Sequence, residues 1–462
     1  MKKILATAIT IAMVLACVLT LAACGPKSLV IWVGEESTTY YTAAVAKYVE
    51  NYATAKGEAF PYTIEVKGVD SSTAAEAVLK DPNAGPAIFT VPHDNLGKLI
   101  GTSPVIAAIT SESLLAQIEN DNPDGYKNVI KNKIGGQEFV FAVPYIGQAL
   151  VLYYNKEAIS ADQVKSWEGI MEAAKAAGPN VKAATVMGND SFNLSFFMLA
   201  RNAATKATSV RIYEGSDMTE MLASCYCTGD DTMANFKWAQ RFFNDPNGGQ
   251  LSGSDTFETL LHDGKVLSLV GGAWKFNGVK SALGNKLGIA QLPTYTISEA
   301  DAYGTCTAGT VMKSGTFADC KVFCINAFSN VVSRGDKALC EDLVQYLSSK
   351  EVQEGSFEQC NNLPTYKNAA KEFAAMQADT IEAQLAAKQT EMSEWGIPQP
   401  FGYHSFLNLF FYQKGADTYT QDILLKRDSA NGNVAAYDTD AKLLEGLQII
   451  ENIWKTGKAT GK

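Results

Sequence analysis

Short hydrophobic runs alternate with amphipathic segments along the part of the chain that follows its apolar amino terminus. Residues 28–33 (SLVIWV) predict a strand, and the next segment carries apolar side chains at helical spacing, at Tyr41, Val45, Tyr48 and Tyr52. Residues 62–66 and 87–91 predict two further strands, with a helix over 72–79 between them. Strands and helices that alternate at this spacing favour parallel βαβ units with helices on both faces of the sheet.

The same alternation continues toward the carboxyl terminus. Further strands are predicted at 139–143, 149–154, 183–187, 266–270, 288–292 and 321–325. Helical patterns occupy 233–243, 337–347, 369–389 and 441–454. No internal repeat interrupts them, so the sequence predicts an α/β protein, and its 462 residues suffice for more than one domain.

The first 24 residues combine two lysines, an apolar run of about twenty residues and the sequence Leu21-Ala22-Ala23-Cys24. This order is typical of an export signal, and a cysteine directly after Leu-Ala-Ala resembles the lipobox of bacterial lipoproteins. We therefore predict a signal peptide over 1–23, a lipidated tether over 24–28 with Cys24 acylated, and an extracytoplasmic protein anchored to the bacterial cell membrane by its lipid. Two alternatives stay open: an uncleaved transmembrane helix, and cleavage at a second match over residues 14–17.

Composition and charge argue against a disordered protein and against a nucleic-acid-binding protein. Apolar residues make up 47% of the chain and charged residues 19%, which favours large folded cores over disorder. The net charge of −10 argues against a nucleic-acid partner, because such binding depends on Lys and Arg that neutralise phosphates. The three histidines stand in separate contexts, so we expect no metal site and no histidine-based triad.

Neither the cysteines nor the motifs of known enzymes indicate a metal site or a catalytic centre. Seven cysteines remain beyond the signal peptide and Cys24, and their spacings match no common zinc pattern. We expect them to act as small buried hydrophobes, with one or two disulfides as the alternative. The sequence contains no G-x-S-x-G elbow, no phosphate-binding P-loop and no H-E-x-x-H motif, so we expect neither a cofactor nor an enzyme.

Five segments, in order, resemble the solute-binding lipoproteins of sugar ABC transporters, specifically the maltose/maltodextrin-binding type. The resemblance is distributed, and its most specific stretch is the third of the five. The segments are 29–32 (LVIW), 88–97 (IFTVPHDNLG), 142–156 (AVPYIGQALVLYYNK), 264–293 with Gly272-Ala273-Trp274 and the return strand LGIAQLP, and 396–400 (GIPQP).

This resemblance implies a two-lobed periplasmic-binding-protein-like fold of type II, with discontinuous lobes joined by crossover hinge strands. It places 29–146 plus 294–346 in the N-terminal lobe and 147–293 plus 350–462 in the C-terminal lobe, with crossings near 147–150 and 288–293 and a third near 346–350. It also implies a monomer that binds a carbohydrate between its lobes, at the carboxyl ends of strands, and delivers it to the permease subunits of an ABC transporter.

A sugar offers apolar C–H patches and a ring of hydroxyls, so its site needs flat aromatic faces and planar hydrogen-bonding groups. Trp274 matches the family's stacking tryptophan, with a core position as the alternative. Asp94 matches the family's hydroxyl-accepting aspartate, with an N-cap for the following helix as the alternative. Glu35 and Glu36 are either cleft ligands or first-turn acids that favour a helix dipole.

Several positions depart from the family's pattern. Asn95 replaces a common arginine, Gln148 stands where an acidic residue is usual, and the segment around Asn193 lacks the familiar Glu-x-Tyr pair. Tyr403 and Phe406 stand where a tryptophan often occurs. We keep these five residues as candidate ligand-binding residues. Amides in place of charged groups suit a neutral oligosaccharide better than a charged ligand.

The leading hypothesis is a binding protein that captures a carbohydrate, such as a maltodextrin, and passes it on unchanged. One alternative keeps the fold and replaces the sugar with a polyamine, a peptide or an anion. A second alternative is an extracellular glycosidase in which Glu35 or Glu36 works with Asp94 as the acid and base.

Overall fold

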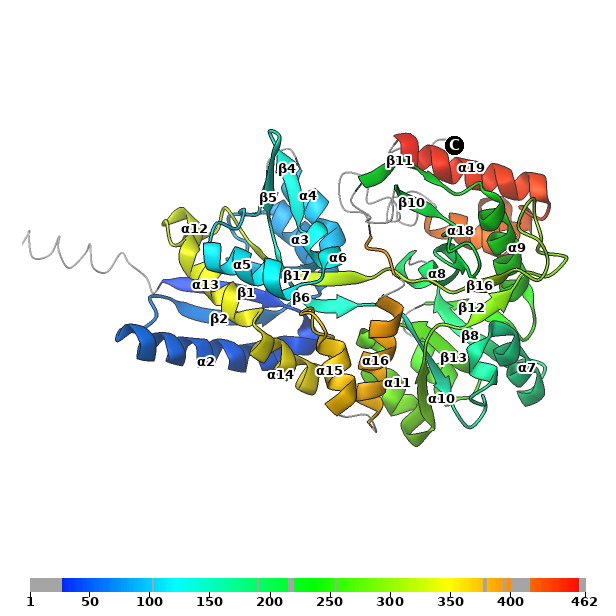
Figure 1. Cartoon of the computed structure of the whole chain (residues 1–462), viewed down its shortest axis with the longest axis horizontal. Helices are drawn as coiled ribbons and strands as arrows, with labels where there is room; N and C mark the ends of the chain where they lie inside the picture. The colour runs from blue at the N-terminus through cyan, green and yellow to red at the C-terminus, as the bar shows by residue number, and fades with distance from the viewer. Residues whose placement is uncertain are drawn as a thin grey trace, which may run out of the picture.

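The computed structural model describes residues 27–101, 104–188, 191–214, 220–253, 256–376, 380–393, 396–399 and 416–456. Two lobes lie side by side along the long axis of the molecule, and each is built on a mixed five-stranded sheet covered by helices (Figure 1). Each lobe has its own cluster of buried hydrophobic side chains. The predicted two-lobed α/β fold is therefore confirmed.

The sheet of the first lobe has the strand order β2-β1-β3-β17-β6. Strand β1 is parallel to β2 and β3, whereas β17 is antiparallel to both β3 and β6. All seven residues of β17 are buried, as expected for an interior strand with helices on both faces. The strands span β1 Ser28–Val33, β2 Thr63–Gly68, β3 Ile88–Pro92, β6 Val143–Gln148 and β17 Asp319–Ile325.

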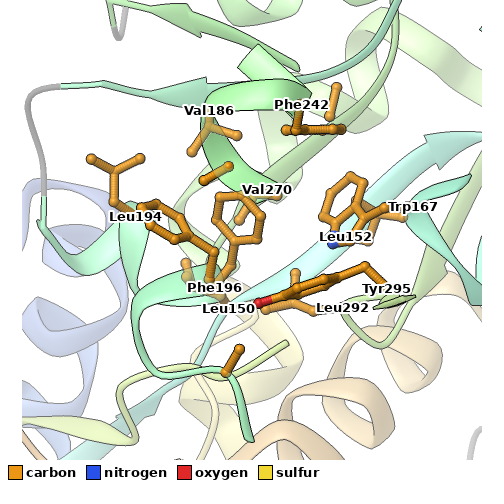
Figure 2. Packing of buried hydrophobic residues seen from close by; sticks show 14 of the residues in the cluster. Leu150, Leu152, Trp167, Val186, Leu194, Phe196, Phe242, Val270, Leu292 and Tyr295 are labelled. Atoms are coloured by element: carbon orange, nitrogen blue, oxygen red, sulfur yellow. The ribbon is translucent and has the colours of Figure 1, made fainter. Parts of the chain in front are cut away.

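The sheet of the second lobe has the order β12-β8-β13-β7-β14. Strand β8 is parallel to β12 and β13, and β7 is antiparallel to β13 and β14. Large aromatic side chains fill the core, where Trp167 lies 5.4 Å from Phe196 and 5.1 Å from Phe242 between ring centroids (Figure 2). The strands span β7 Val151–Asn155, β8 Lys182–Met187, β12 Gly249–Ser252, β13 Val266–Gly271 and β14 Leu287–Ala290.

Helices cover both sheets, and their ends carry the expected caps. Gly57, whose φ of 71° is left-handed, is the C-cap of α2, and Asp70, whose side chain accepts a hydrogen bond from the Ser72 amide, is the N-cap of α3. Around the first lobe lie α2 Thr38–Lys56, α3 Ser71–Lys80, α4 Leu96–Ile100, α5 Glu112–Asp121, α6 Asp124–Asn128, α12 Asn330–Ser333, α13 Lys337–Leu347 and α14 Lys350–Cys360. The others are α7 Trp167–Ala177, α8 Ser191–Met198, α9 Asp230–Asn244, α10 Phe257–His262, α11 Phe276–Leu283, α15 Ala369–Met376, α16 Ile381–Ser393, α18 Ala416–Leu424 and α19 Asp440–Thr456.

Smaller sheets complete the described part of the chain. Strands β4 (Lys131–Ile134) and β5 (Gln137–Val140) form a hairpin in the first lobe, so the strand predicted at 139–143 is divided between β5 and β6. A three-stranded sheet has the order β15 (Thr294–Thr296), β16 (Val311–Lys313) and β9 (Arg201–Asn202). Two further pairs are β10 (Arg211–Glu214) with β11 (Glu220–Tyr226), and β18 (Arg427–Asp428) with β19 (Val434–Ala435). None of the helices within the described ranges has the length and apolar character needed to cross a bilayer.

The chain passes between the lobes at places that only partly match the prediction. Strand β6 leads directly into β7, in the predicted region 147–150. Residues 294–318, which we assigned to the first lobe, instead carry Tyr295, Met312 and Phe317 into the core of the second lobe. The third crossing does not lie at 346–350, because α14 packs against α2, where the Tyr40 hydroxyl donates to the Val352 carbonyl at 2.6 Å.

Cysteine side chains are part of the cores. Cys320 and Cys324 on β17 and Cys340 on α13 are buried thiols in the first lobe, and Cys306 is buried in the second. Burial raises the pKa of each of these thiols, so each remains protonated and unreactive. For these four residues, the role of small buried hydrophobes holds and the disulfide alternative does not.

Candidate functional site

A pocket of about 700 Å³ takes its lining residues from both lobes. Six residues selected from the sequence line it together, although they are far apart along the chain. They are Glu35, Glu36, Asp94, Asn95, Gln148 and Trp274. Gln148 at the end of β6 is one of these lining residues, and Asp319 and Lys321 of the neighbouring strand β17 are two others. This pocket is the candidate site.

Trp274 provides an aromatic wall on the second lobe. Strand β13 ends at Gly271, and the chain then forms the single-turn helix η4 (Ala273–Lys275), which carries Trp274. The side chain is 41% exposed, so Trp274 is not the core tryptophan that the sequence left open. The ring of Phe192, at the start of α8, meets it edge-on with 5.5 Å between centroids. An exposed indole supported from the side suits stacking against an apolar ligand face.

Asp94 lies on the opposite wall, in the single-turn helix η2 (His93–Asn95) after β3. It is 7% exposed, and the Asn95 side-chain amide donates to its Oδ1 at 3.2 Å. Burial raises the pKa of Asp94 to about 6, and the nearby Asp319 carboxylate adds to the effect, while Lys98 opposes it. The N-cap of the following helix α4 is Asn95, so the alternative of an N-cap role for Asp94 is wrong.

Glu35 and Glu36 form the single-turn helix η1 (Glu35–Ser37) after β1. Both glutamates are exposed, and Glu36 pairs with Lys321 on β17, with 2.7 Å between Oε1 and Nζ. Burial favours the neutral form of Glu36, but the charge and hydrogen bond of Lys321 outweigh it and lower the pKa of this carboxyl. The ion pair fixes Glu36 at the rim of the pocket, so it is more than a first-turn acid.

A buried polar cluster lies behind Asp94, and the sequence did not reveal it. The backbone N–H and the side-chain amide of Gln399 both donate to the Asp319 carboxylate, the former at 2.8 Å. His93 Nε2 lies 2.9 Å from the Gln399 carbonyl, and its Nδ1 accepts from the Cys320 amide at 3.4 Å. This pattern assigns the ring proton to Nε2. The cluster holds residues 396–399 against the first lobe.

Other lining residues were also missed, and one predicted residue lies elsewhere. Phe192, Asp319, Lys321 and Gln399 line the pocket, together with Asp70 and Lys98. Asn193 is 3% exposed and does not line it, because consecutive residues of a helix point about 100° apart and Phe192 takes the inward position. Tyr403, Phe406 and Cys24 lie outside the described residues.

The two walls of the pocket differ in chemistry. The first lobe contributes carboxylates, lysines and the neutral amide of Gln148 on β6, and the second contributes the indole of Trp274 and the ring of Phe192. Within the described ranges, no group of three or more His, Cys, Asp or Glu side chains is arranged to hold a metal ion. The arrangement can grip a molecule with one apolar face and several hydroxyls.

Comparison with known proteins gives a consistent result. Residues 47–385 match the family model described as bacterial extracellular solute-binding protein. The galactooligosaccharide-binding protein of Bacillus subtilis (strain 168) is 23% identical over 410 residues, which cover 83% of this chain and 85% of that protein. The maltooligosaccharide ABC transporter solute-binding lipoprotein of Streptococcus pneumoniae (strain ATCC BAA-255 / R6) is 24% identical over 56% of this chain and 60% of its own length.

Solved structures share the fold. The maltodextrin-binding protein of L. casei BL23 without ligand has a TM-score of 0.68 at 19% identity, covering 94% of this chain and 100% of that one. A cyclo/maltodextrin-binding protein complexed with maltotetraose has a TM-score of 0.66 at 17% identity, covering 95% and 99%. At these identities the likeness establishes the architecture and leaves the ligand to the chemistry of the site.

Proposed function

Since the chain belongs to the family of bacterial extracellular solute-binding proteins, we propose that it captures a carbohydrate in the pocket between its lobes and delivers it to the permease of an ABC transporter. One observation carries this proposal: the exposed indole of Trp274 and the buried carboxyl of Asp94 line one pocket from opposite lobes. A sugar ring needs this combination, because its C–H face stacks on an aromatic ring while its hydroxyls donate to carboxylates and amides.

A neutral oligosaccharide such as a maltodextrin fits the pocket best. The volume of about 700 Å³ lies within the range of small-molecule sites, with space for more than one sugar ring. Carboxylates dominate the first-lobe wall, which disfavours an anionic ligand. The names of the two relatives above, a galactooligosaccharide-binding and a maltooligosaccharide-binding protein, support a carbohydrate ligand.

Binding without chemical change is the proposed mode of action. The relatives above are named as binding proteins, which supports this reading over a glycosidase. A ligand that touches both walls favours the conformation in which the lobes are close, and it shifts that equilibrium only by its differential affinity. The protein then acts as a monomer that presents the closed, loaded form to the permease.

The proposal is tested with a glycan panel read by thermal unfolding. Maltotetraose, galactotriose, a uronic-acid oligosaccharide and spermidine are added to the purified chain without its signal peptide. We expect a neutral oligosaccharide to raise the Tm in proportion to the logarithm of its concentration, because it binds the folded state alone. A rise with spermidine or the acidic sugar alone, or no rise with any of the neutral glycans, contradicts the proposal.

We also propose that the mature protein is anchored outside the cytoplasmic membrane by a lipid on Cys24. Replacing Cys24 with Ala is expected to release the protein from the membrane fraction into the medium or periplasm, because acyl chains supply the membrane affinity. The measurement is fractionation followed by immunoblotting, with Cys320→Ala as a matched control that leaves the anchor intact. A Cys24→Ala protein that still needs detergent for extraction would instead support an uncleaved transmembrane helix.

A further inference from the structure

The Gly272 backbone carbonyl anchors the turn that carries Trp274. The Gly272 carbonyl accepts a hydrogen bond from the Lys275 amide at 3.0 Å, which closes the η4 turn. The same oxygen accepts a second bond from the Tyr153 hydroxyl at 2.9 Å. One side chain of the core therefore fixes the turn that presents the exposed indole.

Tyr153 is well placed to act as an anchor. It belongs to β7, opposite Leu269 of β13, and it is 0% exposed. Burial raises the pKa of the Tyr153 phenol far above its ordinary value, so the hydroxyl remains a donor. Its hydroxyl donates to the carbonyl of Gly272, the first residue after β13. A tyrosine that served packing alone would not need this hydroxyl.

Gly272 contributes by leaving space. A Cβ at this position would overlap ring carbons of Trp274, so the indole lies directly against the backbone of Gly272. The φ of Gly272 is −94°, which any residue adopts, so the close approach of the ring is what requires glycine here. The hydroxyl of Tyr153 therefore binds the turn through the Gly272 carbonyl, and the absence of a side chain at Gly272 lets the Trp274 ring pack directly against the backbone.

We propose that Tyr153 is a positioning residue for ligand binding: its hydroxyl, through the Gly272 carbonyl, holds Trp274 in its binding orientation before the ligand arrives. This inference rests on the proposed function, because it assigns Tyr153 a role in the same site. A ring fixed in advance loses less conformational freedom when the ligand binds, and this strengthens binding without any direct contact from Tyr153.

The decisive experiment is a double-mutant cycle between Tyr153→Phe and Trp274→Ala, with affinities for maltotetraose and galactotriose measured by isothermal titration calorimetry. We expect Tyr153→Phe to weaken binding roughly fivefold, the worth of one net hydrogen bond. In the Trp274→Ala background, Tyr153→Phe is expected to cause no further loss, because it acts through the indole. Equal losses in both backgrounds, or no loss in the wild-type background, overturn the inference.

A matched control separates positioning from general stability. Tyr295 is also 0% exposed in the second lobe, and its hydroxyl donates to Asn235 Oδ1 at 2.7 Å within the core. Tyr295→Phe is expected to lower the Tm as much as Tyr153→Phe and to leave affinity unchanged. Similarly, Gly272→Ala is expected to weaken binding, whereas Gly253→Ala, with open space around its Cβ, is expected to have no effect.

If the wild-type protein binds neither sugar, that result counts against the proposed function and not against the positioning role of Tyr153. The positioning role is then tested by a measurement without ligand. The near-UV circular dichroism of Trp274 is obtained as the difference between the wild type and Trp274→Ala. We expect this band to shrink in the Tyr153→Phe background, because an indole without a fixed orientation has little rotational strength. An unchanged band overturns the positioning role whatever the ligand is.

Discussion

Trp274→Ala is expected to weaken oligosaccharide binding by about 1–3 kcal/mol, or roughly 5- to 150-fold in Kd. The variant removes the large exposed aromatic face of the second-lobe wall, and the edge of Phe192 cannot replace it because it meets the indole at 66°. The Tm is expected to change little, because the side chain is 41% exposed and lies outside the core cluster. Titration calorimetry with the neutral glycan from the panel measures the effect.

The conservative variant Trp274→Phe provides the control for this prediction. It keeps a flat ring on the same turn, so we expect it to retain part of the affinity that Trp274→Ala loses. An unchanged Kd for Trp274→Ala would remove this residue from the site. An equal loss in both variants would indicate that the indole N–H, rather than the ring face, makes the essential contact.

Asp94→Asn is expected to make the first lobe more stable at neutral pH while weakening ligand binding. Burial and Asp319 raise the pKa of Asp94 from 3.8 to about 6. Because the folded pKa is the higher one, the contribution of Asp94 to stability is fully present below about pH 4 and is lost as the pH rises through 6. The shift corresponds to about 3 kcal/mol of unfolding free energy that the wild type loses when Asp94 ionises. The neutral amide of Asp94→Asn does not ionise, so the variant keeps this free energy at pH 7.

Urea unfolding between pH 4 and 7 measures this effect as the difference between the wild type and Asp94→Asn. We expect the variant to gain stability relative to the wild type as the pH rises, and parallel pH profiles would contradict the raised pKa. At pH 7 the wild-type carboxylate is mostly ionised and accepts sugar hydroxyls more strongly than an amide, so the variant should bind about tenfold more weakly. A gain in stability with unchanged affinity would place Asp94 outside the ligand contacts.

Local patterns predicted the regular elements well. The helix predicted over 337–347 and the strand predicted over 28–33 have the bounds of α13 and β1. Both segments have a clear apolar periodicity and a turn signal at their ends, so burial and local preference agree. The long helix predicted over 369–389 is two helices, α15 and α16, because helical periodicity gives no sign of where a surface helix is interrupted.

Contacts between distant segments were harder to predict. Residues 294–318 were assigned to the first lobe because the predicted crossing at 288–293 precedes them, but β15 pairs with β16, and β16 pairs with β9 of the second lobe. No local signal encodes this pairing, since strands of three residues carry almost no periodicity. The assignment of α14 failed for the same reason: its contacts with α2 join segments about three hundred residues apart.

The residues of the candidate site also fall into those that the sequence identified and those that it missed. Asp94 after β3 and Trp274 after β13 were identified by the resemblance to sugar-binding lipoproteins, and both line the pocket near the end of a strand, where ligand sites of α/β sheets occur. Asp319 and Gln399 were missed because their importance comes from each other, across eighty positions of sequence. The only available sign was an aspartate at the start of a long buried strand, where an ionised side chain requires a buried partner.

The position of β17 has a consequence for biosynthesis. This strand lies between β3 and β6 in the first sheet, yet it emerges from the ribosome only after every strand of the second sheet. Until then β3 and β6 lack a shared neighbour, and the first lobe cannot close its core. The first lobe of a nascent chain therefore stays incomplete through most of synthesis, which suits passage through a secretion channel. The first lobe also cannot be cut out as one continuous fragment, because β17 joins its sheet from beyond the strands of the second sheet.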